Sequence, residues 1–210
     1  MDERIQESNK VCLITGFGRP LAKKIHEILK ERKMKIWTTS RQTPADFVGD
    51  LSNFNFSKNI VQQIGFMDLL ICCHGGHKND ENNFVNMLND NLLSSINICE
   101  NVLSQMVEHK KGKIIVIGSY AACFGKPSGI AYSVAKSALH QYVRCIAAKY
   151  RDFGISVNCI APGNISEGKT QDKITYNEIA DVISNLINIE GNCINSQIIR
   201  VDRGKHSFGC

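Results

Sequence analysis

Short apolar runs alternate with amphipathic stripes along almost the whole of this 210-residue chain. The runs are rich in Val, Ile and Leu, as is typical of strands that are buried on both faces of a parallel sheet. The stripes repeat at the helical period, as on helices that cover such a sheet. The alternation therefore predicts an α/β fold with a doubly wound, mostly parallel sheet of about seven strands flanked by helices. The predicted strands are residues 11–15, 35–39, 46–48, 67–71, 113–118, 156–161 and 198–201.

The length suits a single domain, residues 1–210, which is large enough to bury a full core. No apolar run approaches the roughly 20 residues that a membrane span needs. Residues 1–10 are polar and charged, unlike a signal peptide. The nine cysteines have no even spacing, so we expect reduced thiols in a cytoplasmic protein.

The net charge of +5 comes from dispersed lysines and arginines, and no nucleic-acid-binding motif accompanies it. We therefore expect neither a nucleic acid nor a membrane as partner. A mildly basic chain is compatible with a phosphorylated cofactor.

The first predicted strand, residues 11–15, leads through a turn that contains glycines into a helical stripe. The turn residues are Gly16, Phe17, Gly18, Arg19, Pro20 and Leu21. Strand, turn and helix in this order are typical of dinucleotide binding, with phosphate at the amino end of the helix. Pro20 suits a first helical turn, because its missing N–H would have no intrahelical partner, although it removes one possible phosphate donor.

Ser119 lies thirteen residues before Tyr132, and Lys136 follows that tyrosine by four. Tyr132 and Lys136 therefore share one helix face. Ser119 ends a predicted strand, so the three side chains are expected to meet at the carboxyl edge of the sheet. A phenol with a pKa near ~10 is a poor acid at neutral pH, but a neighbouring ammonium lowers that pKa. The set predicts acid–base chemistry on a carbonyl or an alcohol; the alternative is a surface Tyr/Lys pair.

In this order and spacing, the glycine turn, Ser119, Tyr132 and Lys136 resemble the motifs of the short-chain dehydrogenase/reductase family. The resemblance extends from Val11 to Gly204 and implies a Rossmann-type fold and hydride transfer with a nicotinamide cofactor. It implies that Ser119 holds the substrate oxygen and that Tyr132 is the acid or base. It also implies that Tyr132 and Lys136 contact the cofactor and that Lys136 lowers the phenol pKa.

Asn91 matches the family's catalytic asparagine by its register from Met106 and from Ser119. In the family this residue bends its helix and holds a water in the proton relay to the lysine. Asn89 is a neighbouring candidate, and a polar helix residue without a role is the other alternative.

The second predicted strand ends in Ser40-Arg41, where members of the family that prefer NAD have an acidic residue. Arg19 lies in the first turn. Two guanidinium groups near the adenosine ribose suit a 2′-phosphate, which they bind through charge-assisted hydrogen bonds. We therefore predict NADP(H), that is NADP or NADPH, as the cofactor. The alternative is two solvated surface arginines.

The resemblance implies further contacts with the cofactor. Asp50 and Leu51 match the Asp-Val or Asp-Leu pair that lies at the adenine in the family. Cys72-Cys73-His74-Gly75 stands where the family usually has Asn-Asn-Ala-Gly. Pro162, Gly163 and Ile165 match the turn under the nicotinamide. The expected cofactor contacts thus include Asp50, Leu51, Cys73, His74, Gly75, Pro162, Gly163 and Ile165.

Cys72, Cys73, His74 and His77 also suggest a zinc site. Consecutive strand residues point to opposite faces, so the first three cannot easily converge on one ion. No second pair of ligands follows at the usual spacing. We predict no metal.

Three departures from the family are expected to affect the structure. About five residues separate the second and third strands, too few for a helical crossover, which needs about a dozen. The polar segment 167–172 is a short substrate lid. Pro20 and Ala22 replace two of the family's glycines.

In the family, the helix after Asn91 and the helix from Tyr132 usually build the interface between subunits. The resemblance therefore implies a homodimer or homotetramer.

The sequence therefore predicts an NADP(H)-dependent oxidoreductase that reduces a small-molecule carbonyl, or oxidises the alcohol. The alternative is a catalytically weakened member of the family that acts as an NADP(H)-binding, regulatory or interaction module. Fold and motifs do not fix the substrate.

Overall fold

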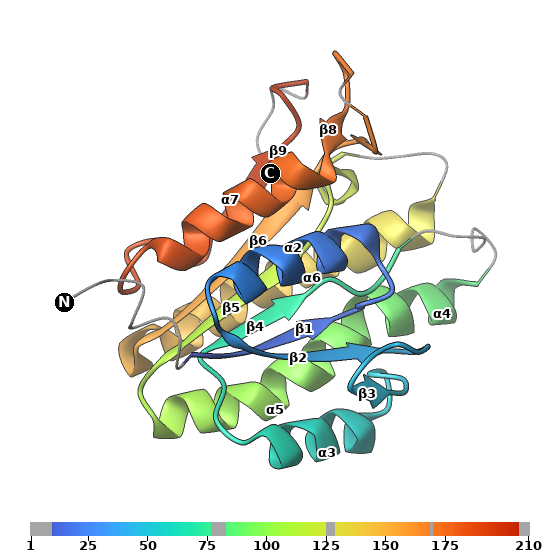
Figure 1. The fold of residues 1–210 in the computed structure, drawn as a ribbon. Helices are drawn as coiled ribbons and strands as arrows, with labels where there is room; N and C mark the ends of the chain where they lie inside the picture. Colours follow the sequence, from blue (N-terminus) through green and yellow to red (C-terminus); the bar gives the residue numbers. More distant parts are fainter. Residues whose placement is uncertain (1–9, 77–82, 125–128, 169, 206–210) are drawn as a thin grey trace.

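The computed structural model describes residues 10–76, 83–124, 129–168 and 170–205. Its centre is a seven-stranded, all-parallel sheet in the order β3-β2-β1-β4-β5-β6-β9 (Figure 1). The strands are β1 (Val11–Thr15), β2 (Lys35–Ser40), β3 (Phe47–Val48), β4 (Leu69–Cys72), β5 (Gly112–Ile117), β6 (Ile155–Pro162) and β9 (Ile198–Val201). The predicted doubly wound α/β fold is confirmed.

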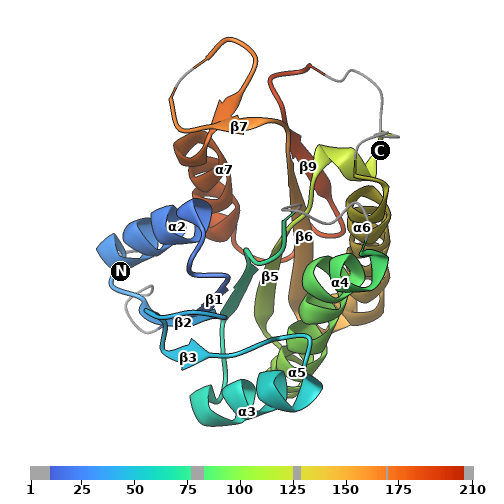
Figure 2. The same ribbon diagram turned by 90° about the vertical axis from the view of Figure 1, so that its right-hand side faces the viewer.

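Helices cover both faces of the sheet. On one face lie α2 (Pro20–Glu31) and α7 (Tyr176–Asn188), and on the other lie α3 (Phe54–Ile64), α5 (Ser94–Glu108) and α6 (Ile130–Tyr150) (Figure 2). The remaining described elements are short: α4 (Phe84–Leu88), a π-helical turn (Asn89–Leu93), two 3₁₀ turns (Tyr120–Ala122 and Arg151–Phe153), β7 (Ile165–Ser166) and β8 (Ile174–Thr175). None of the described helices is long and apolar enough to span a bilayer.

Alternate strand residues feed two separate cores, because side chains leave a strand on alternating faces. Cys72 packs in the core beneath α3, α5 and α6, whereas Cys73 packs in the core beneath α2 and α7. The expectation that these neighbours point apart is therefore confirmed. Seven described cysteines are free thiols. Cys123 is disulfide-bonded, so the expectation of reduced thiols throughout is wrong there.

No helix lies between β2 and β3, as the short spacing predicts. Asp46 stabilises this direct connection, since its carboxylate accepts hydrogen bonds from the Thr38 N–H (2.8 Å) and hydroxyl (2.7 Å). The connection keeps β3 at the edge of the sheet, with two residues paired to β2.

Some boundaries differ from the predicted ones. The helix α3 begins before Phe56, because the Asn53 side chain accepts hydrogen bonds from two N–H groups of its first turn. The strand β4 begins at Leu69, directly after Asp68, whose carboxylate accepts the Val11 N–H at 3.0 Å. The predicted lid, residues 167–172, lies between the two strands of a small sheet, β7 and β8.

Candidate active site

Ser119, Tyr132 and Lys136 lie together at the carboxyl edge of the sheet. Ser119 follows β5, and its Oγ accepts the Ala121 N–H at 3.2 Å, which caps the 3₁₀ turn. Tyr132 is hydrogen-bonded to Ser119. The Lys136 Nζ lies 5.9 Å from the centroid of the Tyr132 ring. The three residues are thus close enough to act on one small group.

Lys136 is an almost completely buried lysine, 3% exposed. Its Nζ donates a hydrogen bond to the Ile117 carbonyl at 2.8 Å, which ties α6 to the end of β5. Burial lowers the pKa of Lys136 from its usual 10.5 to about 8. The side chain is therefore an ammonium at neutral pH, and it titrates within the range of ordinary assays.

The pKa of the Tyr132 phenol is raised, whereas the sequence predicted that Lys136 lowers it. Burial raises its pKa above the usual value of 10, and this outweighs the lowering effects of the hydrogen bond to Ser119 and of the Arg19 charge. The Lys136 ammonium is directed at the Ile117 carbonyl. A protonated phenol beside a serine hydroxyl is the arrangement of a proton donor.

Asn91 lies in the π-helical turn between α4 and α5 and is completely buried. Its side-chain Oδ1 accepts the Gly76 N–H at 2.8 Å, and its Nδ2 donates to the Gly76 carbonyl (3.0 Å) and the Met87 carbonyl (3.2 Å). A π-turn inside a helix often marks a functional site. The π-helical turn thus lies where the helix was expected to bend, and it contains both Asn91 and the partly exposed Asn89, whose carbonyl accepts the Ser94 N–H.

Gly75 and Gly76 allow this contact to form. A Cβ at Gly75 would lie 2.5 Å from the Asn91 Oδ1, and its φ of +96° favours glycine. A Cβ at Gly76 would lie 2.7 Å from the Arg19 guanidinium. The loop after β4 thus brings Asn91 and Arg19 to the same edge of the sheet.

The turn after β1 is tight and packs against the loop that follows β4. Gly16 has a φ of +67°, and a Cβ there would lie 2.7 Å from the backbone of His74. The Arg19 N–H donates to the Gly16 carbonyl at 2.9 Å. Arg19 is the N-cap of α2 and Pro20 is its first residue, as predicted. The amino end of α2 therefore lies at the carboxyl edge of β1; Phe17 and Gly18 lie in the turn, and the buried Leu21 is the second residue of α2.

His74 joins three elements, a role that sequence reasoning missed. Its Nδ1 lies 2.6 Å from the Thr15 Oγ1 of β1, and its Nε2 lies 2.9 Å from the Ser95 Oγ of α5. Burial lowers its pKa to about 3, helped by the charges of Lys136, Arg41 and Arg19. Both ring nitrogens are engaged with hydroxyl groups, which is a structural use of the ring. His77, the other histidine of the considered zinc site, lies outside the described residues.

Arg41 is paired with two carboxylates. Its Nη1 donates to the Asp90 Oδ2 at 3.1 Å, and its Nε lies 3.4 Å from the Asp50 Oδ2. The hydrogen bond to Asp90 raises the pKa of Arg41. Asp50 also accepts the Ser52 N–H at 2.8 Å. Arg41, which was predicted to bind the 2′-phosphate, is therefore paired with carboxylates of the protein in this structure. The sequence did not indicate these pairs.

The remaining predicted cofactor residues lie at the same edge. Pro162 ends β6, and the Gly163 N–H donates to the Val201 carbonyl at 2.9 Å. A Cβ at Gly163 would lie 2.8 Å from the Cβ of Asp202, so the turn fits tightly against the end of β9. Ile165 begins β7, and the buried Leu51 follows β3.

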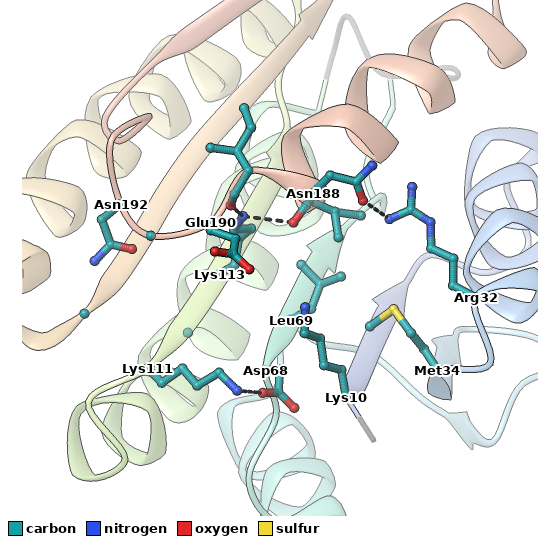
Figure 3. Close-up of a pocket in the computed structure, with 15 residues that line it drawn as sticks. Lys10, Arg32, Met34, Asp68, Leu69, Lys111, Lys113, Asn188, Glu190 and Asn192 are labelled. Carbon is teal, nitrogen blue, oxygen red and sulfur yellow. Dashed lines mark hydrogen bonds and ion pairs between the residues drawn. The ribbon is translucent and has the colours of Figure 1, made fainter. Parts of the chain in front are cut away.

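A cavity of about 880 Å³ lies away from these residues, where the strands begin (Figure 3). Two of the lysines that line it, Lys111 and Lys113, have structural partners. Lys111 forms an ion pair of 2.6 Å with Asp68. The Lys113 Nζ donates to three carbonyls at the end of α7, those of Leu186, Ile187 and Ile189. None of the predicted site residues lines this cavity, so we place the chemistry at the carboxyl edge.

The comparisons with known proteins agree with this geometry. A family model described as short chain dehydrogenase matches residues 21–178. The 3-oxoacyl-[acyl-carrier-protein] reductase FabG of Buchnera aphidicola is 29% identical, over 96% of this chain and 99% of that protein. FabG of Vibrio cholerae is 27% identical over 77% of this chain and 76% of that protein.

Among solved structures, ElxO with NADP bound has a TM-score of 0.84 and 22% sequence identity, and the match covers 95% of this chain and 100% of that chain. This likeness concerns the fold. Because the family model matches most of the chain, this protein belongs to the short-chain dehydrogenase/reductase family of oxidoreductases.

Proposed function

We propose that this protein is an NADP(H)-dependent reductase that converts a carbonyl to an alcohol, or catalyses the reverse reaction, with Tyr132 as the acid or base. The observation that carries the proposal is the meeting of Ser119, Tyr132 and Lys136 at the carboxyl edge of the sheet, next to the turn that opens α2. Open α/β sheets bind their ligands at this edge.

The residues present fit a dinucleotide. The left-handed Gly16 and the amino end of α2 suit a pyrophosphate, since the N–H groups of a first helical turn favour anions. Arg19 and Arg41 are assigned to the 2′-phosphate, Asp50 and Leu51 to the adenine side, and Cys73, His74 and Gly75 to the loop beneath the ribose. Pro162, Gly163 and Ile165 are assigned to the nicotinamide end. NADP in the related ElxO structure supports this choice of cofactor.

When bound, the nicotinamide supplies or accepts the hydride. Tyr132 donates its phenol proton to the carbonyl oxygen in the reduction. The Ser119 hydroxyl hydrogen-bonds the same oxygen, where negative charge develops and preorganised donors contribute most. The Lys136 ammonium favours the phenolate that remains. The Asn91 amide fixes the Gly75–Gly76 loop at the edge of the site and, in this proposal, orders a water behind Lys136.

The substrate class tested first is a 3-oxoacyl thioester, because two relatives are named as 3-oxoacyl-[acyl-carrier-protein] reductases. The reacting group is then a ketone beside a methylene, which needs one proton donor and one hydride. A panel of small ketones, sugars and steroid ketones tests the other classes that the family resemblance leaves open.

Two observations favour a second candidate, a family member that binds NADP(H) with weak turnover and acts as a regulatory or interaction module. Arg41 is already paired with Asp50 and Asp90. Pro20 removes one N–H from the phosphate-binding turn. Both features weaken binding of the cofactor compared with a glycine-rich turn and an unpaired arginine.

One experiment separates the two candidates. NADPH and NADH are titrated against the protein by fluorescence. Turnover is then measured on the carbonyl panel for the wild type and for Ser119→Ala, which lacks the proposed substrate-binding hydroxyl. The reductase predicts NADPH binding and a turnover that Ser119→Ala reduces at least tenfold. Binding without turnover on any substrate would favour the second candidate.

A homodimer or homotetramer is part of the proposal. Phe84 and Val85 on α4, and Ile130 and Val134 on α6, are exposed apolar side chains, and an exposed apolar surface of this kind often marks an interface. Light scattering at assay concentration measures the mass. A monomer of 23.4 kDa would contradict this part.

A further inference from the structure

His140 extends the row of active-site residues on α6. It lies four residues after Lys136 and eight after Tyr132, so the three side chains share one helix face. His140 is 3% exposed. It belongs to none of the motifs that predict the site, and its position near the reacting groups therefore needs a separate explanation.

The imidazole holds the backbone of the catalytic serine. The Ser119 N–H donates a hydrogen bond to the His140 Nε2, with 3.4 Å between the nitrogens. A backbone N–H can only donate, so Nε2 must be the unprotonated nitrogen and Nδ1 must carry the proton of the neutral ring. The contact thus selects one tautomer of His140.

The residue before the serine is packed against the same ring. A Cβ at Gly118 would lie 2.3 Å from the His140 Nε2 and 2.5 Å from the Cys159 Sγ. The Gly118 N–H donates to the Ile160 carbonyl at 2.7 Å. The backbone that carries Ser119 is therefore fixed from two directions, by β6 and by His140.

The ring remains neutral at the pH of ordinary assays. Burial, together with the charges of Lys136 and Arg144, lowers the pKa of His140 to about 4. A neutral ring keeps its acceptor nitrogen available to the Ser119 N–H and adds no positive charge next to Lys136.

We propose that His140 is a positioning residue for the reduction: its Nε2 holds the Ser119 backbone so that the serine hydroxyl is aimed at the substrate oxygen. The inference rests on the proposed function, because it assigns His140 a part in that reaction. His140 does not touch the substrate; it acts through Ser119. A misplacement of a reacting group by about 1 Å can cost about a hundredfold in rate.

The test is a double-mutant cycle on the full chain. His140→Leu removes the acceptor, and we expect kcat to fall about ten- to a hundredfold while the Kd of NADPH stays within about twofold of wild type. His140→Gln keeps an acceptor and should recover most of that loss. In the Ser119→Ala background, His140→Leu should have no further effect, because the group that it positions is gone.

Val143→Ala is the matched control, because Val143 is a fully buried residue of the same helix whose apolar side chain cannot hydrogen-bond Ser119. It should lower stability and leave kcat unchanged. If His140→Leu does not fold, His140→Met takes its place in the cycle. An NMR measurement on the wild-type protein does not depend on any variant: the imidazole nitrogens of His140 should show protonated Nδ1 and bare Nε2.

The outcomes are distinct. An equal loss in the wild-type and Ser119→Ala backgrounds would overturn the positioning role, as would a wild-type kcat in His140→Leu or a proton on Nε2. Absence of turnover in the wild-type protein would overturn the proposed function, and this inference with it. A loss of kcat in His140→Leu that His140→Gln largely restores would support the positioning role of His140.

Discussion

Arg41 and Asp90 form an ion pair between the end of β2 and the π-helical turn, with the Arg41 Nη1 3.1 Å from the Asp90 Oδ2. Asp90 directly precedes Asn91 in the π-helical turn. The pair therefore links the end of β2, where the adenosine half of a dinucleotide is expected, to the turn that carries the proposed catalytic asparagine. In the proposed function the 2′-phosphate of NADP(H) uses the same guanidinium, so the proposal predicts that the cofactor and Asp90 compete for Arg41.

Asp90→Asn should tighten NADPH binding about two- to fivefold, because it removes a competing carboxylate from a half-exposed pair of the kind worth about 1 kcal/mol or less. The Kd of NADH should change little. Fluorescence titration of NADPH and NADH measures the Kd of each for the variant and for the wild type. Glu27→Gln, which removes the exposed pair of Glu27 with Lys24 on α2, is the control and should change neither Kd. Equal tightening of both cofactors would contradict competition for the 2′-phosphate.

Arg41→Ala should weaken NADPH binding about tenfold, the lower end for a lost charge-assisted hydrogen bond, because Arg41 is half exposed. NADH lacks the 2′-phosphate and should bind as before. The same titration checks this result. Identical NADPH affinity in Arg41→Ala and wild type would remove Arg41 from the cofactor site.

Tyr132→Phe removes only the phenol oxygen, so it should lower kcat about 10²- to 10⁴-fold and leave the Kd of NADPH nearly intact. Lys136→Ala should impair both kcat and NADPH binding, because the ammonium serves both in the proposed mechanism. Stopped-flow turnover on a confirmed substrate and cofactor titration separate the two effects. Near wild-type kcat in Tyr132→Phe would show that another group is the acid.

The pH dependence of the reduction should follow Lys136. Burial lowers the pKa of Lys136 to about 8, so the ammonium is lost above that pH. The kcat/KM for reduction should therefore fall about tenfold per pH unit above about pH 8, since this profile reports the free enzyme. Any residual activity of Lys136→Arg should lack this decline, because a guanidinium stays protonated. A flat wild-type profile from pH 7 to 10 would contradict the assignment.

Acid should destabilise the protein partly through His140. Its folded-state pKa of about 4 lies below the ordinary 6.5, so the unfolded chain binds the proton first. The contribution to stability is present above pH 6.5 and is lost as the pH falls toward 4, by up to about 1.4 kcal/mol per pH unit. Urea unfolding of wild type and His140→Gln between pH 4 and 7 should show a shallower dependence in the variant. Parallel curves would mean that the pKa of His140 is the same in the folded and unfolded protein.

The local pattern of the sequence was sufficient for most of the fold. The bounds of β1 and β9 were predicted to the residue, and Pro20 begins α2 as its missing N–H suggests. The spacing of Tyr132 and Lys136 placed both on one helix face. These features depend on periodicity, turn chemistry and strand length, which act over a few neighbouring residues.

Contacts between distant residues decided the rest. Arg41 meets Asp90 across 49 positions, His74 meets Thr15 across 59, and Ser119 meets His140 across 21. No local pattern encodes such pairs, because they form only when separate elements pack at one edge of the sheet. The Tyr132 pKa follows the same rule: the sequence predicted a lowered value from Lys136, whereas burial, which depends on the whole fold, raises it. The sequence alone therefore determined the family, the positions of most strands along the chain and the proposed reacting groups, and the tertiary structure decided which side chains hold those groups in place and in which protonation state.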